Sequence, residues 1–391
     1  MFKNKTQSGP DIIFVLLFAF LVIFGIVMLS SASTAIAFQR FGDSLYYVKH
    51  QLLNGFIPGV LICIVLSLID YRFWRQFAFP AFVVSILLLI AVFIPGIGRT
   101  FNGSRSWLEI GSIIFQPVEI VKLGFILYLS VWLEKRDRKT IKDFSDGLMP
   151  FLISLGIVMG LILLQPDVGS MGVIVMIALM IYFVAGADIK HLLALGGIGV
   201  GLLAFLIKIA PYRAARFTVF LHPETDPQGL GYHINQALLA IGSGGLVGLG
   251  FAHSRQKHLY LPEVINDSIF AIIAEELGFV MVTIILAAFL ALIIRGYTIA
   301  RNSPDNFGKL VTTGIISWIG FQGFINIAAM VGLMPITGLP LPFVSYGSSS
   351  LIVLFAAMGL VINISRHTQQ SGPGKRLSRV ISYRGKKTKH A

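Results

Sequence analysis

Ten apolar runs, each about as long as a membrane-spanning helix, divide this chain of 391 residues. A helix that crosses the hydrocarbon core of a bilayer needs about 20 apolar residues. The sequence therefore predicts an all-α polytopic membrane protein with about ten transmembrane helices. The expected spans are residues 12–30, 51–69, 77–95, 114–133, 148–165, 168–186, 190–209, 268–294, 309–333 and 345–364.

The composition excludes several other classes of protein. Hydrophobic residues make up 55% of the chain and charged residues only 13%, whereas a soluble domain carries about a quarter charged residues. A soluble enzyme, a disordered chain and a collagen-like chain are therefore excluded. The single cysteine, Cys63, excludes an intramolecular disulfide, a thiolate zinc site and an iron–sulfur cluster.

The distribution of basic residues predicts the orientation in the membrane. Ten spans place both termini on one side, and that side holds about two thirds of the 31 lysines and arginines. Because loops rich in these residues stay in the cytoplasm, we expect cytoplasmic tails at residues 1–11 and 367–391 around a transmembrane domain at 12–366. The basic C-terminal tail suits anionic lipid headgroups. It has too few interleaved aromatic residues to suit nucleic acid.

One large extracytoplasmic loop is expected between the seventh and eighth helices, at about residues 210–267. Connections of this length tend to be functional. Its segment Ile234–Gly250 is apolar and rich in glycine. This composition favours a segment that dips into the membrane, where protein or water must surround its free backbone groups.

Two charged side chains lie inside the fourth predicted span. Glu119 and Lys122 are three residues apart, so they share one face of the helix. Such a pair returns about 0.2–0.5 kcal/mol, which is too little to offset the burial of two charges. We therefore expect further partners or a polar cavity beside them. A structural ion pair and contact with a substrate both remain open.

Two aspartates lie at the starts of predicted spans. Asp167 follows Pro166, which interrupts the helix, and Asp267 ends the large loop directly before the eighth span. Asp is a preferred N-cap residue, so capping is one interpretation of each, and a functional site is the other. Glu275 and Glu276 lie on other faces of the helix from Asp267, and structural hydrogen bonding is expected for both.

The outer face also gathers cations and hydroxyl groups. Cations beside a carboxylate suit a phosphate-bearing substrate, although ordinary contact with headgroups is the alternative. A metal site is not supported, because no third ligand follows the two histidines at a typical spacing. The Pro340–Ser350 segment, which includes Ser345, can cap the last helix and present hydroxyl groups outward. The cations and histidines of the large loop are Arg213, Arg216, His253, Arg255, Lys257 and His258.

Taken together, these segments resemble the SEDS family of bacterial shape, elongation, division and sporulation proteins (FtsW/RodA/SpoVE). The match runs in order over about residues 12–366, and the Ser254–Glu263 string favours the FtsW-like branch. Where many members have His-Thr-Asp, this chain has Ile265-Asn266-Asp267. The matching strings are Gly103–Trp107, Gln116–Lys122, Gln165–Gly169, Asp226–Tyr232, Ile241–Gly245, Leu261–Glu263, Asp267–Ala271, Glu275–Gly278 and Pro340–Ser350.

The resemblance implies a peptidoglycan glycosyltransferase in the bacterial cytoplasmic (inner) membrane, with its active site on the extracytoplasmic side. Such proteins polymerise lipid II, a disaccharide-pentapeptide on undecaprenyl pyrophosphate. They work with a class B penicillin-binding protein and other divisome or elongasome membrane proteins. The family's catalytic aspartate falls on Asp267, as general base. A lipid II flippase or transporter, and a non-catalytic scaffold for the penicillin-binding protein, are the alternatives.

The resemblance also assigns roles to residues around Asp267. No cofactor is certain, although a divalent cation (Mg or Mn) would share the task of balancing the charge of the leaving pyrophosphate. Glu119 and Lys122 are expected to shape a cavity, with Asp167 at its rim. The complete expected set of substrate-binding residues is Arg105, Glu119, Lys122, Asp167, Arg216, Arg255, Lys257, Glu263 and Ser345.

Overall fold

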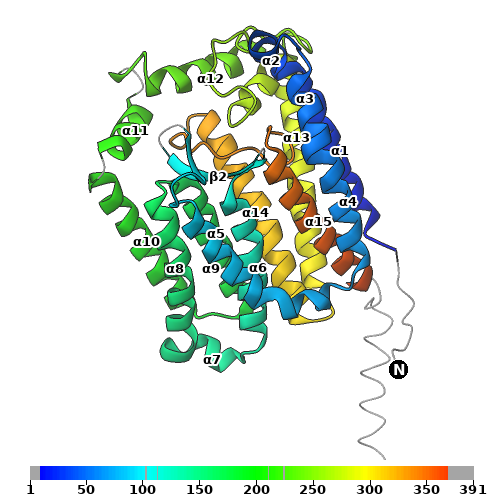
Figure 1. Cartoon of the computed structure of the whole chain (residues 1–391), viewed down its shortest axis with the longest axis vertical. Helices are drawn as coiled ribbons and strands as arrows, with labels where there is room; N and C mark the ends of the chain where they lie inside the picture. The colour runs from blue at the N-terminus through cyan, green and yellow to red at the C-terminus, as the bar shows by residue number, and fades with distance from the viewer. Residues whose placement is uncertain (1–8, 102–103, 112, 210, 223–224, 369–391) are drawn as a thin grey trace, which may run out of the picture.

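The computed structural model describes residues 9–101, 104–111, 113–209, 211–222 and 225–368. They form a bundle of long helices, with shorter elements across one end (Figure 1). The long helices are α1 (Ile12–Ala32), α4 (Ile57–Leu68), α5 (Ala78–Ala91), α6 (Pro117–Glu134), α8 (Met149–Leu164), α9 (Val168–Ala185), α10 (Ile189–Ile209), α13 (Ile269–Arg301), α14 (Asn306–Met330) and α15 (Ser348–Thr368).

Shorter helices and one small sheet complete the fold. The sheet is antiparallel, in the order β1-β2-β3, with strands β1 (Gly98–Phe101), β2 (Ser104–Ile110) and β3 (Ile113–Phe115). The short helices are α2 (Thr34–Phe41), α3 (Tyr46–Gln51), α7 (Arg138–Lys142), α11 (Pro211–Leu221) and α12 (Leu230–Gly244). Two π-helical turns, η1 (Leu52–Phe56) and η3 (Phe144–Leu148), and one 3-10 turn, η2 (Tyr71–Phe77), lead into α4, α8 and α5.

The predicted class is confirmed as a mostly helical membrane protein, whereas the small sheet was not expected. Within the described residues, nine helical segments are long and apolar enough to cross a membrane, and they correspond to nine of the ten predicted spans. The remaining span is α6, which has 18 residues and carries Glu119, Lys122 and Glu134. It begins at Pro117 rather than at residue 114 because β3 occupies the preceding residues. Most of α6 is buried against α5, α9, α14 and α15.

Both ends of the described chain meet at one end of the bundle (Figure 1). The backbone N–H of Asp11 donates to Ser365 Oγ at 3.0 Å, and the Asp11 carboxylate accepts from Arg295 Nε at 2.9 Å. This geometry agrees with an even number of spans. The predicted tails fall largely at residues 1–8 and 369–391, outside the described residues, and the cytoplasmic location of this end stays a prediction.

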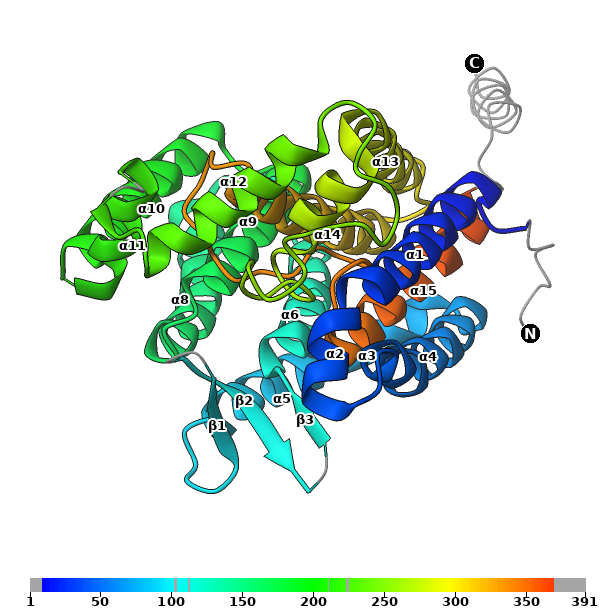
Figure 2. The same ribbon diagram turned by 90° about the horizontal axis from the view of Figure 1, so that it is seen from above.

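The large loop between α10 and α13 contains two helices and a long irregular segment. Helices α11 and α12 lie across the end of the bundle opposite the chain ends (Figures 1 and 2). The first part of the segment Ile234–Gly250 forms most of α12, and its expected dip into the membrane stays a prediction. Its glycine-rich remainder packs against a break in α13.

This break lies at Gly278, whose φ of 71° and ψ of 179° are not helical. An interruption of the helix releases backbone groups that need partners in an apolar environment. Residues 245–250 supply them on both sides of the break. Leu249 N and Gly250 N donate to the carbonyls of Glu275 and Glu276, at 3.0 Å each. In return, Phe279 N donates to Gly245 O at 2.9 Å, and Val280 N to Leu246 O at 3.1 Å.

Glycine is required where the two segments meet. The positive φ of Gly278 is strained for any L side chain, and a Cβ at this position would collide with the backbone nitrogen of Gly248. A Cβ at Gly248 would in turn collide with the Glu276 carbonyl. The close approach of the two backbones therefore depends on the absence of both side chains.

We predict that Gly278→Ala destabilises the protein by about 1–3 kcal/mol, because it combines backbone strain with a collision at Gly248. The measurement is the free energy of unfolding in detergent. Gly156→Ala is the matched control, since a Cβ there meets no atom within 4 Å and its φ is ordinary. Equal stability of the two variants would contradict the close approach of the two backbones at Gly248 and Gly278.

Candidate active site

Asp267 lies two residues before Ile269, the first residue of α13. Ser268 occupies the N-cap position, and no side chain caps the helix there. The Asp267 side chain is 5% exposed, and its Oδ1 atom has no hydrogen-bond partner among the described residues. The capping interpretation of Asp267 is therefore wrong: the preferred cap residue is displaced by one position. A buried carboxylate oxygen without a partner is instead available to a ligand.

The surroundings of Asp267 bring its ionisation into the neutral range. Burial, followed by the negative charge of Glu263, raises the pKa of Asp267 to about 7. The positive charge of Arg216 and a hydrogen bond from the Ser268 side chain act in the opposite direction. A carboxylate with a pKa near the working pH suits a general base.

Polar side chains hold the backbone on both sides of Asp267. Asn326 Nδ2, on α14, donates to the carbonyls of Asp267 at 2.8 Å and Leu339 at 2.7 Å. Ser345 Oγ donates to Asn266 O at 2.5 Å. These bonds join α14, the segment before α15 and the end of the large loop, so they fix the position of the carboxylate without using it.

Two further contacts flank the carboxylate. Asn266 Nδ2 donates to Glu263 Oε2 at 2.5 Å. On the other side, Nε2 of His233, on α12, lies 2.6 Å from Ser268 Oγ. Asn266, the residue before Asp267, therefore holds the glutamate that raises the pKa of Asp267.

The intramembrane pair of Glu119 and Lys122 has the further partners that the sequence predicted. Lys122 Nζ lies 2.8 Å from Glu119 Oε1 and 2.8 Å from Gln322 Oε1. It also lies 4.7 Å from the centre of the Trp318 ring, and Ser350 Oγ donates to Glu119 Oε2 at 3.2 Å. All of these groups come from α6, α14 and α15, so the pair joins the three central helices.

Gln322 extends this network toward Asp267. Its Nε2 donates to Pro340 O at 2.9 Å, next to the Leu339 carbonyl that Asn326 binds. Gln322 and Asn326 lie one turn apart on α14 and are both buried. The structure thus connects Glu119 and Lys122 to Ser345, Asp267 and Glu263 through hydrogen bonds and short backbone segments.

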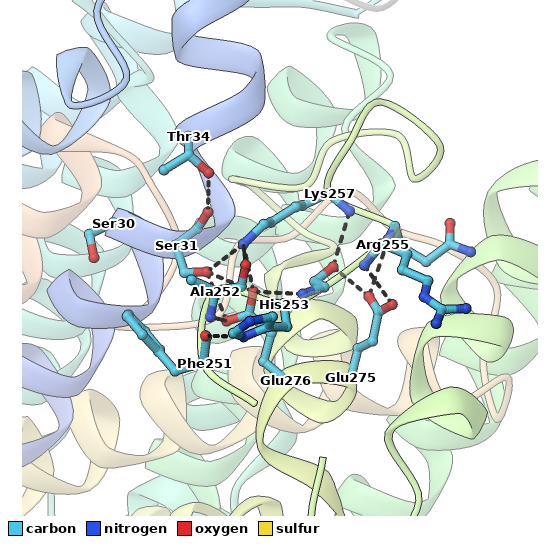
Figure 3. Close-up of polar contacts among 12 residues, drawn as sticks. Ser30, Ser31, Thr34, Phe251, Ala252, His253, Arg255, Lys257, Glu275 and Glu276 are labelled. Carbon is cyan, nitrogen blue, oxygen red and sulfur yellow. Dashed lines mark hydrogen bonds and ion pairs between the residues drawn. The ribbon is translucent and has the colours of Figure 1, made fainter. Parts of the chain in front are cut away.

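Lys257 is held by protein groups alone (Figure 3). Its Nζ lies 2.9 Å from Glu276 Oε1, 2.7 Å from Ala252 O and 3.0 Å from Ser31 Oγ. A lysine ammonium has three donors, and these contacts use all three. The structure therefore gives no support to the predicted contact between Lys257 and substrate.

Glu275 and Glu276 make the structural hydrogen bonds expected of them. Glu275 accepts from Ser254 Oγ at 2.5 Å and from Arg255 N at 2.9 Å. Glu276 accepts from Ser31 Oγ at 2.7 Å and Ala252 N at 3.1 Å (Figure 3).

The side chain of Arg255 is exposed. It lines an open cavity of about 710 Å³ with Gln236, Leu239, Ala252, His253, Ser254, Gln256, His258 and Tyr260.

The remaining predicted residues lie near the sheet. Asp167 accepts from Ser170 N at 3.0 Å, which confirms the predicted cap of α9, and Gln116 Nε2 lies 3.2 Å from its Oδ2. Arg105 Nη2, on β2, donates to Ile94 O at 3.0 Å. Within the part of the chain that the structure describes, no hydrogen bond or ion pair joins Asp167 or Arg105 to the carboxylate of Asp267, so their substrate roles stay predictions.

Sequence reasoning missed three residues of the site. Gln322 and Asn326 are polar residues four apart within an apolar span, and this signal was available in the sequence. His233 had no comparable signal, because its contact with Ser268 crosses from α12 to the start of α13. Across the described ranges, no group of three or more His, Cys, Asp or Glu side chains is placed to hold a metal ion.

We predict that Lys122→Met destabilises the protein by about 3–5 kcal/mol, because it leaves the Glu119 charge buried without its partner. Unfolding by denaturant in detergent measures the change. Removal of both charges in Glu119→Gln/Lys122→Met should restore part of the loss. A double variant no more stable than Lys122→Met would show that the ion pair is not the cause.

Comparison with known proteins shows similarity over almost the whole chain. The FtsW/RodA/SpoVE family model, described as "Cell cycle protein", matches residues 11–370. Stage V sporulation protein E of Bacillus subtilis is 43% identical over 366 residues, which cover 93% of this chain and 99% of that protein. The probable peptidoglycan glycosyltransferase FtsW of Geobacter sulfurreducens is 38% identical over 361 residues, 92% of this chain and 96% of that protein.

Comparison with solved structures shows that the fold is also similar over almost the whole chain. A chain of a peptidoglycan synthase complex that coordinates polymerization and crosslinking is 32% identical, with a TM-score of 0.76, and the match covers 92% of this chain and 99% of that one. The rod shape determining protein RodA of Thermus thermophilus is 31% identical, with a TM-score of 0.68. That match covers 91% of this chain and 97% of the RodA chain.

Proposed function

The chain belongs to the FtsW/RodA/SpoVE family of cell cycle proteins, and on this premise we propose that it is a peptidoglycan glycosyltransferase that polymerises lipid II. The resemblance to the SEDS family is thereby confirmed, with FtsW proteins among the relatives. One observation carries the proposal: Asp267 is a buried carboxylate with one unpartnered oxygen and a pKa of about 7.

In the proposed reaction, Asp267 takes the proton from the 4-hydroxyl group of the acceptor sugar. The oxygen then attacks the anomeric carbon of the donor, and undecaprenyl pyrophosphate leaves from the opposite face. A single displacement of this kind inverts the configuration, whereas retention needs a carboxylate that forms a covalent intermediate. The Asn326 and Ser345 contacts keep the base in place during the transfer.

Cations near the site offset the charge of the leaving pyrophosphate. Arg216 is the first candidate, because its charge acts directly on Asp267. Arg105 and Arg255 remain candidates. Lys257 is no longer one, because its ammonium group already binds Glu276, Ala252 and Ser31. A divalent cation would supply further positive charge at the pyrophosphate, but the described residues offer it no set of protein ligands.

The setting of the reaction follows from the family and from the charge distribution. The chain is a multi-pass membrane protein, and we place it in the bacterial cytoplasmic membrane with Asp267 on the extracytoplasmic side. A class B penicillin-binding protein is the proposed partner, supported by the similarity to a synthase that couples polymerization to crosslinking.

Asp267→Asn tests the assignment of the base. The amide keeps the size of the side chain but cannot accept the proton, so we predict a fall in lipid II polymerisation of about 10²–10⁴-fold. Chain growth by purified protein in detergent is the measurement, with the thermal unfolding midpoint as the control for folding. Neither a flippase nor a non-catalytic scaffold would polymerise lipid II in this assay, with or without the substitution.

The pKa of Asp267 predicts the pH dependence. Burial and Glu263 favour the protonated acid, and only the ionised form is a base. The polymerisation rate should therefore rise about tenfold between pH 6 and pH 8, with a midpoint near pH 7. Glu263→Gln, which removes the like charge, should move the midpoint to lower pH. A midpoint that Glu263→Gln leaves unchanged would contradict this electrostatic account.

A further inference from the structure

The open cavity of about 710 Å³ beside Arg255 has no ligand in the proposed reaction. Its walls are helix α12, through Gln236 and Leu239, and the loop at residues 252–260. Helix α12 crosses the end of the bundle opposite the chain ends (Figures 1 and 2). Sites for small ligands have volumes of about 300–1,000 Å³, so the cavity is large enough for a small molecule or a short peptide.

The cavity lies close to Asp267. Nε2 of His233, on α12, lies 2.6 Å from Ser268 Oγ, and Ser268 directly follows Asp267. Gln236 follows His233 by three residues, so the two side chains share one face of α12 and are about 4.5 Å apart along its axis. The face of α12 that contacts the residue next to Asp267 therefore continues into the wall of the cavity.

Arg255 supplies a positive charge to this cavity. Its backbone N–H donates to Glu275 Oε1 at 2.9 Å, and its guanidinium group points away from that carboxylate (Figure 3). Among the residues that the structure describes, no hydrogen bond or ion pair engages the guanidinium group. Arginine binds carboxylate and phosphate groups through paired hydrogen bonds. The cavity therefore suits an anionic ligand.

Two other groups of the cavity accept hydrogen bonds. Gln256 is 8% exposed, and its Oε1 has no partner within the described ranges. His253 Nδ1 lies 2.8 Å from Phe251 O. Because a carbonyl oxygen only accepts, Nδ1 carries the hydrogen, and Nε2 of the neutral ring is left as an acceptor. Both acceptors require a ligand with N–H or O–H donors.

These requirements distinguish the three polar parts of lipid II. The sugars are neutral and have no charge to pair with Arg255. The ionised pyrophosphate has charge but no hydrogen to donate, so it would leave Gln256 and His253 without partners. The peptide stem carries carboxylates together with amide N–H donors, and it meets both requirements. The exposed side chains of Leu239 and Tyr260 add apolar surface for its residues.

Resting on the proposed polymerisation of lipid II, we propose that this cavity is a binding subsite for the peptide stem of the substrate. Arg255 binds a carboxylate of the stem, and Gln256 and His253 accept from its amide N–H groups. The subsite holds the polar peptide beside Asp267 while the sugars react. This role of Arg255 replaces its contact with the leaving pyrophosphate.

The test compares two forms of lipid II, one with free peptide carboxylates and one with these carboxylates converted to amides. The sugars and the pyrophosphate are the same in both. For the full-length wild-type protein, KM should be about tenfold lower for the free form, which corresponds to one hydrogen bond between charged groups. In Arg255→Gln, KM for the free form should rise about tenfold, so that the two forms become equivalent.

Gln256→Leu separates binding from folding. Because the side-chain oxygen of Gln256 has no partner, loss of the amide should not lower the thermal unfolding midpoint. KM should nevertheless rise severalfold for both forms, since both contain peptide N–H groups. Arg40→Gln is the matched control for Arg255→Gln. Arg40 is exposed on α2, at the same end of the bundle and outside the cavity, so this variant should keep the wild-type preference.

Two results would overturn this inference. One is an equal KM of the wild type for the two forms. The other is an equal loss on both forms in Arg255→Gln, which would indicate a contact with the pyrophosphate.

The proposed function fails separately. Equilibrium binding of the two forms to Asp267→Asn protein in detergent gives the same comparison without turnover. If Asp267→Asn polymerises lipid II normally, Asp267 is not the base, whatever the preference between the forms. If Asp267→Asn is inactive and binds both forms equally, only the peptide subsite is refuted.

Discussion

The backbone hydrogen bonds at the break in α13 determine how the outer end of this protein is built. A helix interrupted at Gly278 leaves carbonyl and N–H groups that an apolar surrounding cannot satisfy. Residues 245–250 bind them on both sides, and this exchange fixes the end of α12 against α13. The side chains of Glu275 and Glu276 then organise the next residues of the loop, which lead to Asp267.

A second set of interactions approaches Asp267 from inside the bundle. The Glu119–Lys122 pair is buried among three helices, and Gln322 and Asn326 continue from it to the carbonyls around Pro340 and Asp267. None of these bonds uses the Asp267 carboxylate. Asp267 is therefore held through its backbone, while one oxygen of its side chain has no partner among the described residues.

The sequence predicted features that depend on neighbouring residues better than those that depend on distant ones. The spans, the Asp167 cap and the need of Glu119 and Lys122 for partners all follow from local periodicity, capping preference and the cost of burying charge. The capping interpretation of Asp267 was wrong, because the N-cap of α13 is the next residue, Ser268. The path of the preceding loop decides where the helix begins, and no local pattern in the sequence reveals that path. The contacts of Lys257 with Glu276 and of His233 with Ser268 join segments whose approach no local pattern reveals.

Helix α1 contacts α13 on both sides of the break. Ser31, at its last turn, binds Glu276 before Gly278, while Asp11, at its cap, binds Arg295 beyond it. Helix α1, which has no break, therefore spans the break in α13 at Gly278. Because α1 contacts both halves of α13, a hinge motion at Gly278 would have to bend α1 or break one of these two contacts.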